Sequence, residues 1–183
     1  LTMDEVEMIA AKPAVKAIAP LQFIPIENVK YATERAREAQ VMGTTAAYEE
    51  VHDSYVEKGR FLSNADVERA AHVAVLGVDI ADALFPFVEA VDKVITLDGR
   101  PFTVIGILQK KGRFLFRSMD NIVLVPVNSI QKQDRRMNFM MGDVKPISPG
   151  HMEAAIDQTR EAMRRYRKLK YLQKDNFGIF SQD

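Results

Sequence analysis

The sequence predicts an α+β fold, with hairpins and short helices in its first two thirds and one long amphipathic helix near its end. Residues 93–108, "KVITLDGRPFTVIGIL", contain two β-rich runs joined at Asp98-Gly99, a dipeptide that favours a type I′ hairpin turn. Residues 72–86, "HVAVLGVDIADALFP", read as a buried strand, a glycine turn and then a helix. Residues 148–172 carry apolar side chains at helical spacing.

The N-terminal region predicts a helix, from its capping residues and a proline that ends it, and then a strand, from the alternation of its apolar side chains. Residues 2–12 predict a helix with the Thr2/Glu5 spacing of a capping box, which Pro13 ends. Residues 14–24 predict a strand in which Pro20 indicates an edge or an irregularity. The alternating side chains of this strand are Val15, Ala17, Ala19, Leu21 and Phe23.

Residues 28–84 predict extended chain followed by short elements. An extended region covers about residues 28–43, although its middle, "TERAREAQ", has a composition that favours a helix. A short helix is expected over residues 48–55. A second follows Ser63, an N-cap with Asp66 three residues on. Residues 72–76 predict a strand, and residues 78–84 one or two helical turns.

The last part of the chain predicts three strands and one long helix. Residues 121–126 and 135–144 predict strands, and "NFGIFSQ", residues 176–182, predicts a closing strand. The long helix is capped by Ser148 and has Pro149 at its first position. Its apolar stripe is Met152, Ile156, Thr159, Met163 and Tyr166.

Composition excludes several function classes. The chain has 183 residues, which suits one domain or two small ones, and its 25 basic residues balance 25 acidic ones, so its charge does not favour nucleic acid. The absence of cysteine excludes disulfides, thiolate metal sites and cysteine nucleophiles. The most apolar region, residues 73–91, contains too many charges to span a bilayer. Because the sequence begins at Leu1, we expect a processed protein or a fragment of a longer chain.

The strand–glycine–helix order around Gly77 raises the possibility of nucleotide binding. A dinucleotide fingerprint needs three glycines that let the backbone approach a pyrophosphate, and here there is only Gly77. Asp79 would repel a phosphate at that helix start. We therefore interpret the turn as packing architecture.

No catalytic, cofactor-binding or metal residue is predicted. His52, His72 and His151 lack the spacing of metal ligands, and no GxSxG or HExxH motif is present. The basic run of residues 164–170 is typical of a solvated helix end with Tyr166 and Leu169 inward, although a place near anionic lipid headgroups also suits it. An acidic group stands where caps, helix faces and turns favour carboxylates: Asp66, Asp79, Asp82, Glu89, Asp92 and Asp98.

An ordered set of short motifs resembles the core domain of MacB-type ABC transporter permeases, in the superfamily of MacB, LolC and FtsX. It runs from a G-T-x-x-x-Y segment through G-R-F, V-A-V-L-G and F-T-V-I-G to a strand ending in V-P, over about two thirds of the chain. The departures are Val91-Asp92, Asn121, and the loop of residues 110–119. The matching residues are Gly43, Thr44, Tyr48, Gly59, Arg60, Phe61, Asp66, Val67, Gly77, Leu84, Phe85, Phe102, Thr103, Val104, Ile105, Gly106, Asp120 and Pro126.

The resemblance implies a two-lobed domain on the extracytoplasmic, periplasmic side of the cytoplasmic membrane. A discontinuous porter-like subdomain would comprise residues 1–43 and 130–183, with a sabre-like subdomain, residues 44–129, inserted between them. Leu1 and Asp183 would lie at the same end. Such a domain is not an enzyme: it transmits ATP-driven conformational change to efflux or to lipoprotein extraction.

The resemblance also implies partners. These are a second permease subunit, a cytoplasmic ATPase domain, flanking membrane helices and, in some relatives, a periplasmic adaptor. Two alternatives stay open: a soluble extracytoplasmic ligand-binding or adaptor module, and an α/β hydrolase. Apolar spans of about 20 residues on both sides in the full gene would favour the permease, and a pocket with convergent titratable groups would favour the enzyme.

Overall fold

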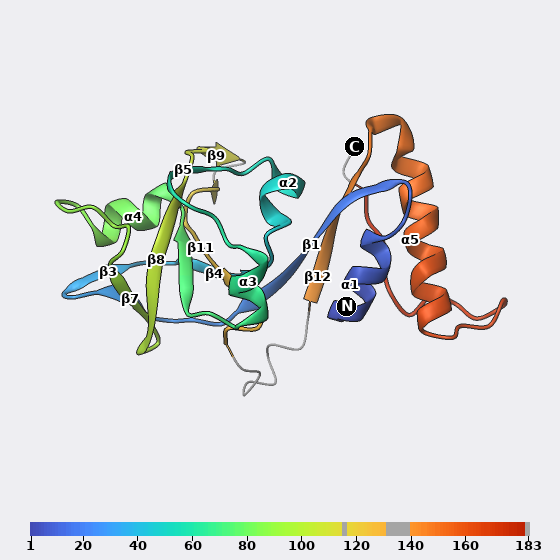
Figure 1. Ribbon diagram of the computed structural model, residues 1–183, viewed down its shortest axis with the longest axis horizontal. Coiled ribbons are helices and arrows are strands. Elements are labelled where there is room, and N and C mark those ends of the chain that lie inside the picture. The colour runs from blue at the N-terminus through green and yellow to red at the C-terminus, as the bar shows by residue number, and fades with distance from the viewer. Residues whose placement is uncertain (115–116, 131–139, 182–183) are drawn as a thin grey trace.

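The computed structural model describes residues 1–114, 117–130 and 140–181. It is a mixed α/β fold built on one ten-stranded sheet, with a small two-stranded sheet beside it (Figure 1). The α-helices are α1 (Met3–Ala10), α2 (Tyr48–His52), α3 (Asn64–Glu68), α4 (Val78–Leu84) and α5 (Met152–Tyr166), and a 3-10 turn, Pro149–His151, leads into α5. Within the described residues, no helix is both long and apolar enough to cross a membrane.

The large sheet contains both parallel and antiparallel neighbours. Its order is β12-β1-β4-β11-β6-β8-β7-β2-β3, and β5 also pairs with β8. The β4–β11 and β6–β8 pairs are parallel, and the others are antiparallel. The strands are β1 (Val15–Ile24), β2 (Val29–Tyr31), β3 (Glu34–Ala36), β4 (Gln40–Thr44), β5 (Val56–Gly59), β6 (Val73–Leu76), β7 (Val94–Leu97), β8 (Arg100–Leu108), β11 (Ile122–Pro126) and β12 (Met140–Pro146), with β9 (Arg113–Phe114) and β10 (Arg117–Ser118) forming the small sheet.

Three hydrophobic clusters organise the described part of the chain. The first lies between the central strands and α4 and contains Ile80 and Phe102. The second includes Tyr48 of α2 and Leu124 of β11. The third joins α1, α5 and β1, and so combines both ends of the sequence; it is made of Val6, Ile9, Ala14, Val15, Ile18, Ala155, Ala162 and Met163.

Strand β1 connects the third cluster to the rest of the molecule. Its residues 15–22 pair with β12, and its residues 22–24 pair with β4. In Figure 1 it runs as a long ribbon from the strands on the left to the α1–α5 pair on the right. Pro20 lies where β1 has a strand neighbour on one side only, as a residue without an N–H requires.

Most predicted elements are confirmed. Both capping boxes are present: Thr2 with Glu5 at α1, and Ser63 with Asp66 at α3. The Asp98-Gly99 turn joins β7 to β8 with φ of 47° and 82°, the sign that a type I′ turn needs. Residues 140–144 of the predicted strand belong to β12, while residues 135–139 lie outside the described part of the chain.

The predicted alternation of β1 is wrong. Ile18, Ala19, Leu21 and Gln22 are all buried, whereas Phe23 is exposed. The reason is that β1 is covered on both faces: Ile18 joins the α1–α5 cluster, and Ala19 and Leu21 join the α2 cluster. A strand buried on two faces reads as a continuous apolar run rather than an alternating one.

Residues 33–40 have a composition that favours a helix, but strand pairing keeps this part of the chain extended. Strand β3 pairs with β2, and β2 pairs with β7. The confirmed reading is the extended one, because the ladder to β7 and the burial of Val29 and Ala36 outweigh a modest intrinsic preference.

The C-terminal predictions need two corrections. The inward side of α5 consists of Ala155, Thr159, Ala162 and Met163, and Tyr166 is exposed, because small residues let α5 approach α1 closely. Residues 176–181 form no strand. Arg167 instead binds the carbonyl and the side chain of Asn176. Asp183 lies outside the described residues, but Leu1 and Phe177 both pack against the α1–α5 cluster.

Candidate functional site

The turn at Gly77 is shaped by a close approach of two backbone segments. A Cβ at residue 77 would lie 2.1 Å from the carbonyl oxygen of Asp120, so only glycine fits there. The N–H of Gly77 donates to Ile122 O at 2.8 Å, and the N–H of Asp79 donates to Asp120 O at 3.2 Å. The start of α4 thus binds the protein's own carbonyls where a nucleotide-binding turn would present free N–H groups to phosphate.

The three histidines occupy separate places. His52 ends α2 and stacks on Tyr48 at 4.3 Å; His72 precedes β6 and stacks on Phe102 at 4.8 Å. His151 lies before α5, with its Nδ1 2.7 Å from the Ser148 hydroxyl. Across the described parts of the chain, no three His, Asp or Glu side chains are grouped as metal ligands.

Four of the six predicted acidic residues have defined structural partners. Asp66 binds Arg60 at 2.6 Å and caps α3 through Ser63; the Arg60 hydrogen bond, more than the Ser63 bonds, holds the pKa of Asp66 well below its usual range. Glu89 pairs with Lys58 at 3.0 Å, and Asp79 accepts from the Ser118 hydroxyl. Asp82 and Asp92 lie exposed on the surface.

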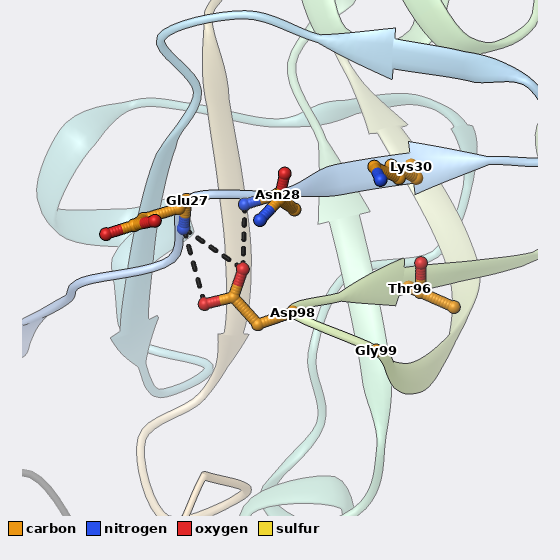
Figure 2. A pocket seen from close by; sticks show the side chains of 6 residues that line it. All are labelled: Glu27, Asn28, Lys30, Thr96, Asp98 and Gly99. Atoms are coloured by element: carbon orange, nitrogen blue, oxygen red, sulfur yellow. Dashed lines mark hydrogen bonds between the residues drawn. The ribbon is translucent and has the colours of Figure 1, made fainter.

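Asp98 lies in a shallow hollow of about 410 Å³, shown in Figure 2. Its carboxylate accepts the N–H of Glu27 at 3.2 Å and that of Asn28 at 2.8 Å, and its own N–H donates to Asn28 O. The carboxylate therefore ties the β7–β8 turn to the start of β2. A carboxylate so occupied is a structural acceptor rather than a general base.

The basic run, predicted to be a solvated helix end, is solvated only in part: Arg165, Lys168 and Lys170 are exposed, whereas two of its arginines are held in ion pairs. Arg167 lies 2.7 Å from the buried carboxylate of Glu5, and Arg164 pairs with Asp175. Tyr166, predicted to face inward, is exposed, and its hydroxyl donates to Asp4. Two arginines of the run therefore stabilise the packing of α5 on α1 and shape the chain that follows.

A set of polar contacts lies where α2 meets the β1–β12 ribbon, and we call this set the junction. Lys145 Nζ donates to the carbonyl of Glu50 and to the carboxylate of Asp53, both at 2.8 Å. Lys16 pairs with Glu50 at 2.5 Å, and His52 Nε2 lies 3.3 Å from Asp143. The junction residues are Lys16, Glu50, His52, Asp53, Asp143 and Lys145.

The charges of the junction are complementary, and its histidine is mostly uncharged at neutral pH. Burial lowers the pKa of His52 below its ordinary 6.5, and Asp143 opposes that shift. Its Nε2 has no aligned hydrogen-bond partner, so the contact with Asp143 strengthens only when the ring is protonated. The Lys145 hydrogen bond lowers the pKa of Asp53, which keeps that pair charged.

Sequence reasoning missed the junction. Its contacts join residues that are 34 positions apart, for Lys16 with Glu50, to 95 positions apart, for Glu50 with Lys145, and no local motif signals their meeting. The signal that could have found it is charge complementarity. Lys16 lies in one predicted strand and Lys145 directly follows another, while Glu, His and Asp side chains cluster at the end of a short predicted helix.

Comparison with known families decides the assignment. A family described as "MacB-like periplasmic core domain" matches residues 1–162. The chain belongs to this family. The resemblance predicted from the sequence is therefore confirmed, together with the periplasmic location that the family's description states.

Two relatives are similar in sequence. The macrolide export ATP-binding/permease protein MacB of Bdellovibrio bacteriovorus is 31% identical over 144 residues, which are 78% of this chain and 22% of that protein. The pyoverdine export ATP-binding/permease protein PvdT of Pseudomonas aeruginosa is 27% identical over 134 residues, 70% of this chain and 19% of that one. The chain thus spans about one fifth of the length of these relatives.

Solved structures share the fold. The periplasmic region of MacB from Actinobacillus actinomycetemcomitans superposes with a TM-score of 0.76 at 16% identity, covering 92% of this chain and 75% of that one. The extracellular domain of the transporter YknZ from Gram-positive bacteria gives a TM-score of 0.75 at 16% identity, with 93% and 86% covered. At 16% sequence identity, these superpositions establish similarity of fold and nothing further.

Proposed function

We propose that this chain is the extracytoplasmic domain of the permease subunit of a MacB-like ABC exporter, and that it transmits motion without catalysing a reaction. The family match over residues 1–162 is the observation that carries the proposal. The arrangement of acidic residues and histidines agrees with it, because Asp66, Glu89 and Asp98 are each bound to a structural partner.

The proposed mechanism needs two units that move relative to one another. We infer a terminal, porter-like unit containing α1, most of β1, β12 and α5, and an inserted, sabre-like unit containing the remaining strands. The shared cluster of α1 and α5 supports the first unit. Residues 29–43, which the resemblance assigns to the terminal unit, contain β2 and most of β4, which pair with β7 and β11, so we place the first boundary near residue 24.

The junction is the proposed route of force between these units. It joins α2 of the inserted unit to β1 and β12 of the terminal unit through side chains, beside the backbone continuity of β1. Each ion pair of the junction has at least one member that is about half exposed or more, and such pairs contribute little individually, so a modest free energy is enough to rearrange them. A contact that is specific but weak suits a moving joint.

The partners and cargo follow from relatives and are part of the proposal. Relatives carry the names of macrolide and pyoverdine exporters with ATP-binding and permease parts. We propose that an ATPase domain supplies the energy, that the permease works as a dimer, and that the cargo belongs to this class of exported small molecules. A periplasmic adaptor is a further proposed partner.

A reversible crosslink across the junction tests the mechanical role. The chain has no cysteine, so Asp53→Cys with Lys145→Cys places a unique thiol pair in this domain of the full-length permease. A short cleavable bismaleimide should abolish transport in proteoliposomes, and cleavage of the crosslink should restore it. The matched control is Val94→Cys with Thr103→Cys, paired strand residues inside the inserted unit, where crosslinking should leave transport unchanged. Full transport with the junction crosslinked would overturn the mechanism.

A further inference from the structure

The loop after α5 presents two large apolar side chains to solvent. Tyr171 is 95% exposed and Leu172 is 91% exposed. Isolated exposed apolar residues are common on proteins, but an adjacent aromatic and aliphatic pair at the tip of one loop is a feature of interaction surfaces. In Figure 1 this loop extends beyond the end of α5, at the lower right.

The loop is held in shape by hydrogen bonds rather than by packing of its own side chains. The Arg164 guanidinium donates to the carbonyls of Lys170, Tyr171 and Gln173. The side chain of Gln173 accepts the N–H of Lys170, and the N–H of Gln173 donates to the carbonyl of Lys170. The structure therefore directs Tyr171 and Leu172 outward on an ordered loop.

Three lysines flank the apolar pair. Lys168, Lys170 and Lys174 are exposed, and none has an ion-pair partner within the described residues. Two carboxylates beside the loop are neutralised, since Arg164 and Arg160 bind Asp175 and Arg167 binds Glu5. The tip thus combines two apolar side chains with unpaired positive charge.

The loop lies at the end of the α1–α5 pair where α1 begins. Tyr166 and Arg167, just before the loop, contact Asp4 and Glu5 in the first turn of α1. A surface that meets this end of the molecule would meet the first residues of the chain and the loop together.

We propose that the loop of residues 168–174 docks on the surface of a bilayer containing anionic lipids. Leu172 would enter the boundary between headgroups and acyl chains, Tyr171 would lie at headgroup level, and the lysine ammoniums would attract lipid phosphates. The inference rests on the proposed function, which places this domain beside a membrane. A protein partner would instead favour a broader patch with charges of both signs at its rim.

The test uses a fluorescent reporter, because the chain has no tryptophan. In the Leu172→Trp variant, vesicles of phosphatidylglycerol and phosphatidylcholine should shift the emission to shorter wavelength, and neutral phosphatidylcholine vesicles should shift it much less. The matched control is Phe87→Trp, an equally exposed position near Asp82 and Glu89 in the other unit, where no shift is expected.

Charge removal gives the second readout. In the reporter background, Lys170→Gln with Lys174→Gln should weaken partitioning to anionic vesicles about 25-fold, at about fivefold for each lysine. An unchanged emission of the Leu172→Trp variant with anionic vesicles would overturn the proposal, and so would equal shifts with neutral vesicles or at position 87. Crosslinking from position 172 to a protein without any vesicle response would also overturn it. The junction crosslink does not involve this loop, so the two proposals fail separately.

Discussion

The guanidinium of Arg167 lies 2.7 Å from the carboxylate of Glu5, and this contact ties the end of α5 to the first turn of α1. Glu5 is 2% exposed, and its carboxylate also accepts the N–H of Thr2 at 2.9 Å in the capping box. One carboxylate therefore serves the start of one helix and the end of another. The contact joins residues 162 positions apart in the sequence.

Replacing Arg167 should destabilise the terminal unit. Arg167→Met leaves the buried Glu5 carboxylate without its cation, and breaking a buried pair in this way costs about 3 kcal/mol. Urea unfolding should show this loss as a lower free energy of unfolding. The control is Arg165→Met, on the exposed side of the same helix, which should stay within about 0.5 kcal/mol of the parent. Equal effects of the two changes would contradict the assignment.

The same pair predicts how stability depends on pH. The Arg167 hydrogen bond lowers the pKa of Glu5, and the Arg60 hydrogen bond lowers that of Asp66. A carboxylate whose pKa is lower in the folded state than in the unfolded state stabilises the fold at pH values above its unfolded-state pKa. This stabilisation is lost as the pH falls through the folded-state pKa. The free energy of unfolding should therefore fall as the pH drops below about 4.5. In Arg167→Met the free energy of unfolding should fall less steeply with decreasing pH. An unchanged slope would show that Glu5 does not contribute to the pH dependence of stability.

The close approach at Gly77 predicts a steric penalty. In Gly77→Ala the new Cβ would meet the Asp120 carbonyl oxygen at 2.1 Å, so two backbone segments must separate at a cost of about 3 kcal/mol. Gly150→Ala is the control, because its nearest neighbour there is a side-chain oxygen 3.9 Å away. Thermal unfolding of both variants measures the difference. Similar melting temperatures for the two would refute the packing role of Gly77.

His52 should titrate below its ordinary range. Burial lowers its pKa below 6.5, and Asp143 raises it only in part. Proton chemical shifts of the His52 ring should therefore give a midpoint below 6.5, and Asp143→Asn should lower the midpoint further. An unchanged midpoint for His52 in Asp143→Asn would show that the two groups do not interact, and a higher midpoint would contradict the sign of the effect.

Local sequence signals predicted the elements of this fold well wherever the determinant was local. The Thr2/Glu5 and Ser63/Asp66 capping boxes and the Asp98-Gly99 turn depend on residues three positions apart or fewer, and all three are present. The alternation of β1 failed because burial of both faces depends on α1, α5 and α2, which lie elsewhere in the sequence.

The functional features were harder to predict because they depend on long-range contacts. The predicted stripe of α5 is confirmed at Thr159 and Met163 and wrong at Tyr166, since Ala155 and Ala162 allow the close approach of α1. The basic run looked solvated because nothing nearby in sequence reveals that Glu5 is the partner of Arg167. The ordered motifs succeeded in identifying the family because a set of positions over most of the chain carries more information than any single contact.

The junction predicts a local change in mobility when Lys145 is replaced. The Lys145 ammonium donates to Glu50 O and to Asp53, at the end of α2, and is itself three-quarters buried. Lys145→Met removes both bonds, and because hydrogen bonds to charged groups are worth about 1 kcal/mol or more, local opening should become about fivefold more frequent. Amide hydrogen exchange at Val51 and Ser54, whose N–H groups bond within this turn, should accelerate by that factor while the β6 and β8 amides stay unchanged.

The matched control is Lys16→Met, which removes the other lysine of the junction. Lys16 and Glu50 are both about half exposed, and exposed pairs contribute little, so exchange in α2 should change less than about twofold. Equal acceleration in the two variants would mean that α2 is held by net charge rather than by the specific bonds of Lys145. Acceleration in Lys145→Met alone would identify Lys145 as the residue through which β12 holds α2. The two lysines carry the same charge, but Lys145 is more buried and is the one that donates to the Glu50 carbonyl.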